Sequence, residues 1–161
     1  MPRRPDAVLG IGNVLMSDDG FGPAVIAALR AGGDLPPGVE ALELGTPGLD
    51  LAEHLAGRER VILVDTVILP EPPGSVWVLE ESELLGGAGA PRATAHQPAL
   101  AESVTRCRLA GAGPRLLCLV GAVPARLAPG TTLSPEVRRA VPLACRRVTE
   151  RLAATAGGTA S

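Results

Sequence analysis

The sequence predicts an α/β protein, a three-layer α/β/α sandwich built on a twisted, mixed but mostly parallel five-stranded sheet. Short apolar runs alternate with segments of helical periodicity, as a layered α/β domain requires. Residues 61–64, VILV, form an unbroken apolar run that is typical of a central strand covered on both faces. The linker LPEPPG is too short for a crossover, so the strand after it should return antiparallel.

Five segments have the composition of strands. The first ends in glycines, and the third, which contains VILV, is the clearest of the five. The fourth follows the short linker and supplies the antiparallel member of the sheet. In chain order, the expected strands cover residues 6–12, 39–45, 60–67, 75–80 and 115–123.

Four segments between and after these strands have helical periodicity. The first helix should begin at Asp18 or Asp19, run to about Arg30 and stop at two glycines. A proline suits the first turn of the third helix, and Ser134 is a plausible N-cap for the last. Between residues 81 and 95 we expect a Gly/Ala-rich loop without regular structure. The other three helices are expected over residues 49–57, 97–111 and 134–152.

Length and composition indicate one domain over residues 1–161. A chain of 161 residues with 46% hydrophobic content can bury one real core but not two ordinary ones. The terminal segment TAGGTAS, from about residue 155, should be disordered. We expect a monomer.

Charge and residue usage exclude several partners. The formal net charge is -2, and one Phe, one Trp and no Tyr offer no platform for stacking bases, so a nucleic-acid partner is disfavoured. No apolar run is long enough for a membrane span or a signal-peptide core. Three widely spaced cysteines without a CxxC pair suit reduced thiols. We therefore expect a soluble, cytoplasmic protein.

Candidate chemistry gathers at one edge of the predicted sheet. In an open, mostly parallel sheet, ligands bind beyond the carboxyl ends of the strands. That rule selects residues 12–19, Asp65 and residues 121–124, and the loop that carries His96 can reach the same edge. Asp19, Asp65 and His96 together form an O,O,N set that can hold a divalent ion and leave coordination positions open.

Each of these residues also has a structural interpretation. Asp18 or Asp19 can cap the first helix, which would contribute ~1 kcal/mol. Asp65 can accept backbone amides from the turn that follows it. An ionised carboxylate at the end of the most buried strand must in any case be paired, capped or bound to something.

Other catalytic motifs are not found. The glycines at positions 10, 12, 20 and 22 do not have GxGxxG spacing, and neither a P-loop nor a GxSxG elbow occurs. None of the cysteines has a local nucleophile signature. Dinucleotide binding and covalent hydrolysis are therefore weakly supported.

Four groups of residues follow one another along the chain: GIGNVLMSDDGFG, VILVDTV with PPGSVWVLE, TAHQPAL, and LVGAVPARLAPGTTLSPEVRRAV. Together, in this order, they resemble the hydrogenase maturation protease family. The resemblance runs from about Ala7 to Leu152. It implies an endopeptidase that removes a C-terminal extension from the large-subunit precursor of a [NiFe] hydrogenase after nickel insertion.

The resemblance also implies roles for individual residues. Asp19, Asp65 and His96 occupy the family's metal-binding positions, whereas Asp18 would cap the helix or support the loop. Nickel would arrive with the substrate as the recognition signal. One position departs from the family pattern, because Ala125 stands where an acidic or polar residue is often found. This difference leaves the exit of the last strand less polar and should affect which substrate the protein accepts.

Two alternatives from other classes remain open from sequence. A nickel-dependent chaperone would use the same three ligands to hold an immature subunit without cutting it. A metal-free α/β binding domain would use all three residues structurally. For the protease, hydrolysis would be metal-assisted or would use an aspartate as the base, and the sequence does not choose between these routes.

Overall fold

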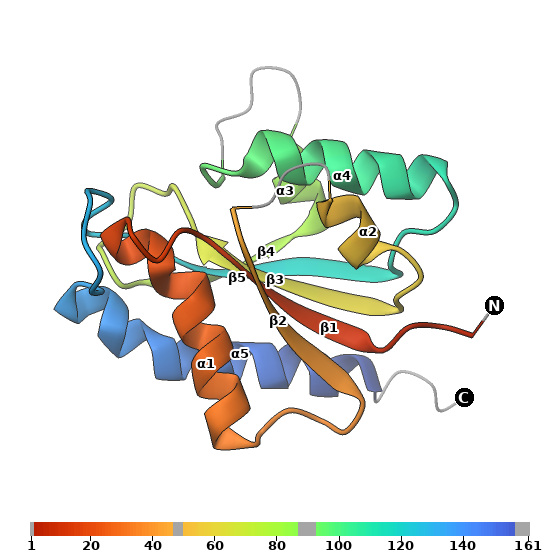
Figure 1. The fold of residues 1–161 in the computed structure, drawn as a ribbon, viewed down its shortest axis with the longest axis horizontal. Coiled ribbons are helices and arrows are strands. Elements are labelled where there is room, and N and C mark those ends of the chain that lie inside the picture. Colours follow the sequence, from red (N-terminus) through yellow and green to blue (C-terminus); the bar gives the residue numbers. More distant parts are fainter. Residues whose placement is uncertain (1, 47–49, 87–92, 157–161) are drawn as a thin grey trace.

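The computed structural model describes residues 2–46, 50–86 and 93–156. Five strands form a single sheet in the order β2-β1-β3-β5-β4 (Figure 1). Pairing is parallel from β2 through β5, and β4 joins antiparallel to β5. The mixed, mostly parallel five-stranded sheet is therefore confirmed. The strands are β1 (Asp6–Ile11), β2 (Val39–Gly45), β3 (Arg60–Thr66), β4 (Val76–Glu80) and β5 (Leu116–Ala122).

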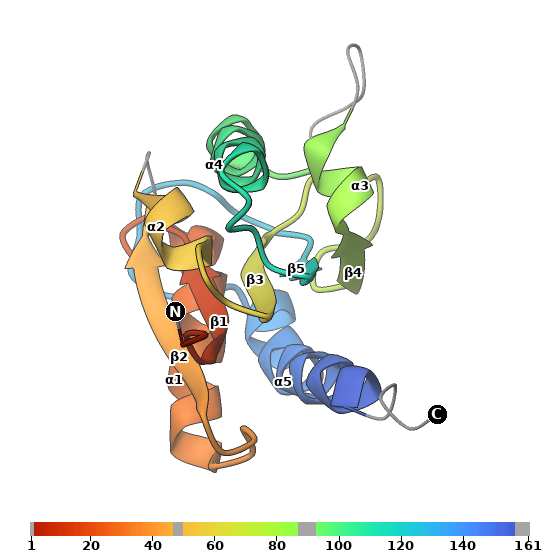
Figure 2. The ribbon, with the colours of Figure 1, turned by 90° about the vertical axis from the view of Figure 1, so that its right-hand side faces the viewer.

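Helices cover both faces of the sheet, which gives three layers. α2, α3 and α4 lie on one face, and α1 and α5 lie on the other (Figures 1 and 2). A single 3-10 turn, η1, precedes α1. Bounds are η1 (Ser17–Gly20), α1 (Phe21–Gly32), α2 (Leu51–Leu55), α3 (Glu81–Leu85), α4 (Gln97–Leu109) and α5 (Pro135–Ala156).

Strand β3 is buried on both faces, as its sequence predicts. Val61 and Leu63 pack into the core under α2, α3 and α4, whereas Ile62 and Val64 pack into the core under α1 and α5. All four side chains are fully buried. The alternation follows from the two-residue period of a strand, and it makes β3 the centre of the molecule.

Three expectations need correction. Residues 81–85 are helical, not a loop: Glu80 and Glu83 form a reciprocal capping box that starts α3. The first helix begins at Phe21, because η1 takes up the two aspartates. Helix α5 continues to Ala156, so the first residues of the predicted tail are ordered. The rest of that tail, most of the GGAGAP loop and the start of the predicted 49–57 helix lie outside the described residues.

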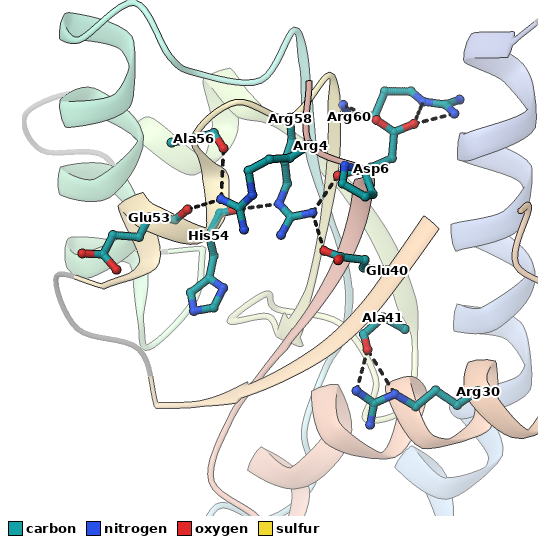
Figure 3. Close-up of polar contacts among 11 residues, drawn as sticks. Arg4, Asp6, Arg30, Glu40, Ala41, Glu53, His54, Ala56, Arg58 and Arg60 are labelled. Atoms are coloured by element: carbon teal, nitrogen blue, oxygen red, sulfur yellow. Dashed lines mark hydrogen bonds and ion pairs between the residues drawn. The ribbon is translucent and has the colours of Figure 1, made fainter. Parts of the chain in front are cut away.

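The amino edge of the sheet is held by a network of arginines (Figure 3). The buried Arg58 side chain donates to the backbone oxygens of His54 and Pro5, each at 2.6 Å, and to Glu40 Oε2 at 2.7 Å. Asp6 accepts the backbone N–H of Arg60 at 2.9 Å and its Nε at 2.7 Å. These contacts tie the starts of β1 and β3 together at the end of the sheet remote from the carboxyl edge.

All three cysteines are free thiols, as expected, and Cys107 and Cys118 are buried in the two cores. Among the described residues, every helix is too short or too polar to cross a lipid bilayer.

Candidate metal and active site

The candidate site lies at the carboxyl edge of the sheet, where α1, α4 and α5 begin (Figure 1). Asp65 is the sixth residue of β3, and its side chain is fully buried. It pairs in register with Gly121 of β5, where a Cβ atom would lie only 2.3 Å from Val67 Cγ1. Glycine at this position therefore lets the chain that leaves β3 pack over β5 beside Asp65.

His96 lies over Asp65 at the N-cap position of α4. Its Nδ1 lies 2.8 Å from Asp65 Oδ2, and Asp65 Oδ1 accepts the Thr66 N–H at 2.8 Å. The His96 backbone N–H donates to Thr94 Oγ1 at 3.1 Å, which fixes the approach of the chain to α4. The ring is thus oriented through Nδ1, and Nε2 is left for another partner.

Asp19 reaches the site from η1. Its Oδ2 accepts the Asn13 N–H at 2.8 Å, so the loop after β1 orients this carboxylate. Gly12 makes this arrangement possible, because its φ is +137° and a Cβ atom there would lie 1.8 Å from the Asp19 carbonyl oxygen. No other residue type fits at position 12 without moving Asp19.

The structure brings the three sequence-predicted residues together. One ligand atom from each of Asp19, Asp65 and His96 lies within 4.8 Å of the other two. These side chains come from three separate loops or strand ends, and they supply two carboxylates and one imidazole. Such a set fits a divalent transition metal and, with three protein ligands, leaves positions for ligands from another molecule.

In the folded protein, Asp65 and His96 both have a pKa above the ordinary value. Burial raises the pKa of Asp65, although the hydrogen bond from His96 opposes this effect. The hydrogen bond to Asp65 raises the pKa of His96, against the lowering effect of burial. Binding of a metal ion to both residues must therefore release a proton, since a metal competes with it.

Asp18 does not point into the cluster. It is fully buried, and its carboxylate accepts hydrogen bonds from the segment that follows β5 and from Ser134 at the start of α5. Burial alone would raise the pKa of Asp18, but these hydrogen bonds outweigh it and lower the pKa. Of the two roles expected for Asp18, loop support is the one the contacts show, because α1 has Gly20 at its N-cap.

Sequence reasoning found the three clustered residues but missed the partners of Asp18. Ser134 was expected only as a helix cap, and its Oγ does accept the Val137 N–H, at 3.4 Å. The sequence singles out Ala125 because its side chain is less polar than the family pattern, and that side chain is exposed. Its contact with Asp18 is made instead by its backbone N–H, which donates to the Asp18 carboxylate at 2.8 Å. A backbone donor leaves no signature in the residue type, so only the fold reveals it.

Comparison with known proteins decides the family. The family model for the hydrogenase maturation protease, HycI, matches residues 23–151, which include Asp65 and His96. The chain belongs to the hydrogenase maturation protease family. Asp19 lies just before the matched range.

Individual members of the hydrogenase maturation protease family match over nearly the whole chain. Hydrogenase 2 maturation protease from Escherichia coli is 32% identical over 142 residues, covering 88% of this chain and 86% of that protein. The hydrogenase expression/formation protein HupD from Rhizobium leguminosarum is 33% identical over 85% of this chain and 68% of its own length. The first similarity supports a protease of hydrogenase maturation, and the second supports a role in hydrogenase formation.

Solved structures show that the fold is shared as well. The hydrogenase maturating endopeptidase HybD from E. coli superimposes with a TM-score of 0.83 at 30% identity, covering 94% of this chain and 93% of that one. The [NiFe] hydrogenase maturation protease HybD from Thermococcus kodakarensis gives a TM-score of 0.75 at 28% identity, covering 92% and 98%. The protein is thus a hydrogenase maturation endopeptidase with the fold of these relatives.

Proposed function

We propose that this protease removes the C-terminal extension of a [NiFe] hydrogenase large-subunit precursor after nickel insertion, and that Asp19, Asp65 and His96 bind the nickel ion that the precursor carries. The observation that supports this proposal is the clustering of three ligand atoms within 4.8 Å of one another. Nickel is part of the substrate in this account. The enzyme supplies ligands for the coordination positions that the precursor leaves open.

The composition of the cluster suits a sensor of substrate-borne nickel. Two carboxylates and one imidazole are few ligands for tight binding of a free nickel ion. A nickel ion already held by the precursor brings its own ligands, so the two partial sets together complete the coordination. Affinity for the precursor would then depend on whether nickel has been inserted, and the metal would align the peptide bond next to it.

Two routes can activate the water that attacks the peptide carbonyl. Nickel can act as a Lewis acid that polarises the carbonyl or lowers the pKa of a bound water. Alternatively, one of the carboxylates can act as a general base, and the raised pKa of the buried Asp65 brings it closer to the range that suits such a role. Exchanging nickel for another divalent ion should change the rate strongly only in the first case.

Intact-mass spectrometry tests the proposed cleavage. A purified large-subunit precursor, loaded with nickel or free of it, is incubated with the wild-type protease or with Asp65→Asn. Loss of a C-terminal peptide only from the nickel-loaded precursor with the wild-type protein supports the proposal. Stable nickel-dependent binding of a cognate precursor without any mass change would instead identify a chaperone and overturn it.

A further inference from the structure

We propose that Asp18 is a positioning residue that sets the place of Asp19 by joining the loop after β1 to the loop after β5 and to the start of α5. This inference rests on the proposed role of Asp19 as a nickel ligand. It assigns the two adjacent aspartates different tasks: Asp19 contacts the metal, and Asp18 acts through Asp19.

The carboxylate of Asp18 is surrounded by donors from one distant segment. Its Oδ2 accepts the backbone N–H groups of Ala125 at 2.8 Å and Arg126 at 2.9 Å, and the Ser134 hydroxyl at 2.9 Å. Its Oδ1 accepts the Ser134 N–H at 2.7 Å. Each donor is more than 100 residues away in the chain, so Asp18 links two segments that no local interaction could hold together.

Backbone contacts on both sides of Asp18 run to the same segment. The Asp18 N–H donates to the Arg126 carbonyl at 3.0 Å, and the Ser17 N–H donates to the Gly130 carbonyl at 2.9 Å. In return, the Gly130 N–H donates to the Leu15 carbonyl at 2.9 Å. The two loops therefore form one hydrogen-bonded unit with Asp18 at its centre.

Ser17 shows that this unit imposes a conformation the chain would not adopt alone. Its φ is +52°, and among the described non-glycine residues it is the one with a positive φ. Its hydroxyl donates to the Ala128 carbonyl at 2.7 Å, and a Cβ atom at Gly130 would lie 2.6 Å from that hydroxyl oxygen. A left-handed serine is strained, so the contacts with residues 125–134 must hold it in place.

Asp19 depends on these contacts because its own element is short. η1 has four residues, and a 3-10 turn of that length has little stability of its own. The Asn13 N–H orients the Asp19 carboxylate but comes from the same loop, so it cannot fix that loop relative to Asp65 and His96. Besides α1, which begins two residues after Asp19, the connection through Asp18 ties Asp19 to the rest of the fold.

The negative charge of Asp18, not only its shape, is needed for this connection. Both carboxylate oxygens face donors. In Asp18→Asn, the side-chain NH₂ group must replace one oxygen and would then face a donor. Repulsion between the two donors should displace η1, whereas Ser134→Ala removes one hydroxyl donor, keeps three backbone donors, and should have a much smaller effect.

The test compares Asp18→Asn with a matched control at the other end of β1. Asp6→Asn also removes a carboxylate that accepts several hydrogen bonds, from Arg60, but lies at the amino edge of the sheet. Three quantities are measured for each protein: the free energy of unfolding in urea, the NMR order parameters of the Asn13 and Asp19 amides, and kcat/KM on nickel-loaded precursor. The proteins compared are the wild type, Asp18→Asn, Ser134→Ala and Asp6→Asn.

We expect Asp18→Asn to lower kcat/KM by about 10- to 100-fold, the usual effect of removing a partner that orients a metal ligand. The order parameters of Asn13 and Asp19 should fall from about 0.85 toward 0.6. Asp6→Asn should leave both quantities unchanged even where it lowers stability as much, and Ser134→Ala should fall between them.

Equal order parameters and equal kcat/KM in Asp18→Asn and Asp6→Asn would overturn the positioning role. The order parameters also separate this inference from the proposed function. If the wild-type protein cuts no precursor, the proposed function fails. The positioning of Asp19 is rejected separately, if the order parameters of the Asn13 and Asp19 amides are the same in Asp18→Asn as in the wild type. If both amides loosen while cleavage persists at the wild-type rate, the catalytic consequence is rejected.

Discussion

His96 Nδ1 lies 2.8 Å from Asp65 Oδ2, and this contact joins the N-cap of α4 to the end of the central strand. The Asp65 side chain is fully buried and the His96 side chain is 13% exposed, so the contact lies where water screens it little. In the proposed function, a nickel ion that binds both residues would have to displace the proton that this pair holds.

The His96 pKa is the first quantity to measure. It should lie above the ordinary value of 6.5 in the wild type, because the hydrogen bond to Asp65 favours the protonated ring. In Asp65→Asn the negative charge is gone and burial remains, so the His96 pKa should fall. NMR titration of the ring protons checks this, with Asp6→Asn as the control. An unchanged His96 pKa in Asp65→Asn would contradict the pairing.

The stability of Asp65→Asn should depend on pH in a defined direction. In the wild type, the folded-state pKa of Asp65 is raised above 3.8 and that of His96 above 6.5. The folded pair therefore binds more protons than the unfolded chain, and its contribution to stability falls as pH rises through these pKa values. Asp65→Asn should be less stable than the wild type near about pH 5 and should equal or exceed it near about pH 8.

Urea unfolding of both proteins across this pH range provides the measurement. Breaking a buried pair typically costs ~3 kcal/mol or more. A loss of stability that stays the same from about pH 5 to about pH 8 would contradict the predicted linkage to the protonation of this pair.

The crowded glycine beside Asp19 allows a sharp test of packing. Gly12→Ala places a Cβ atom 1.8 Å from the Asp19 carbonyl oxygen, whereas Gly33→Ala, also at positive φ, meets no atom within 4 Å. Gly33→Ala should lose about 1–2 kcal/mol of stability from backbone strain. Gly12→Ala should lose about 1–3 kcal/mol more from overpacking.

Gly12→Ala should also abolish nickel-dependent cleavage, because relief of the clash moves Asp19. Chemical unfolding and a cleavage assay on the folded variants separate the two effects. Equal stability loss in Gly12→Ala and Gly33→Ala, with cleavage retained in both, would show that the close approach at Gly12 does not position Asp19.

The fold was largely predictable because its signals are local. The VILV run of β3 identifies a buried central strand, and the short linker before β4 identifies an antiparallel strand. The pairing of β4 with β5 instead of β3 depends on long-range contacts, which the residue pattern does not encode. Helix α3 was missed because five residues show no periodicity and because its N-cap, Glu80, is not one of the residue types that usually mark a capping box.

The candidate site was predictable only in part. The rule for the carboxyl edge of a parallel sheet brought Asp19 and Asp65 together, and the resemblance to a family added weight to His96. The different roles of Asp18 and Asp19 could be predicted only from the resemblance, because both are acidic residues before the same helix. In the structure, the backbone N–H groups of Ala125 and Arg126 hold the Asp18 carboxylate away from the cluster. The residue types at positions 125 and 126 do not predict these hydrogen bonds.

Arg58 should matter for stability and not for cleavage. Its buried side chain supplies hydrogen bonds to the His54 and Pro5 carbonyls at the edge remote from the candidate site (Figure 3). Arg58→Met keeps much of the apolar contact but leaves these acceptors without their donor, so it should cost about 2–4 kcal/mol. Calorimetry or urea unfolding measures the loss. A large fall in kcat/KM of the folded variant would show that the two edges are coupled.

The central claim is that Asp19, Asp65 and His96 detect nickel carried by the precursor. The most direct measurement is the Kd of immobilised precursor, nickel-loaded and nickel-free, for the wild-type protein and for the variant Asp19→Asn/His96→Ala. For the wild type we predict that nickel tightens binding by about 10-fold or more, a typical coupling between sites. In the variant this difference should vanish. The same Kd with and without nickel, or an equal nickel effect in the variant, would contradict the account.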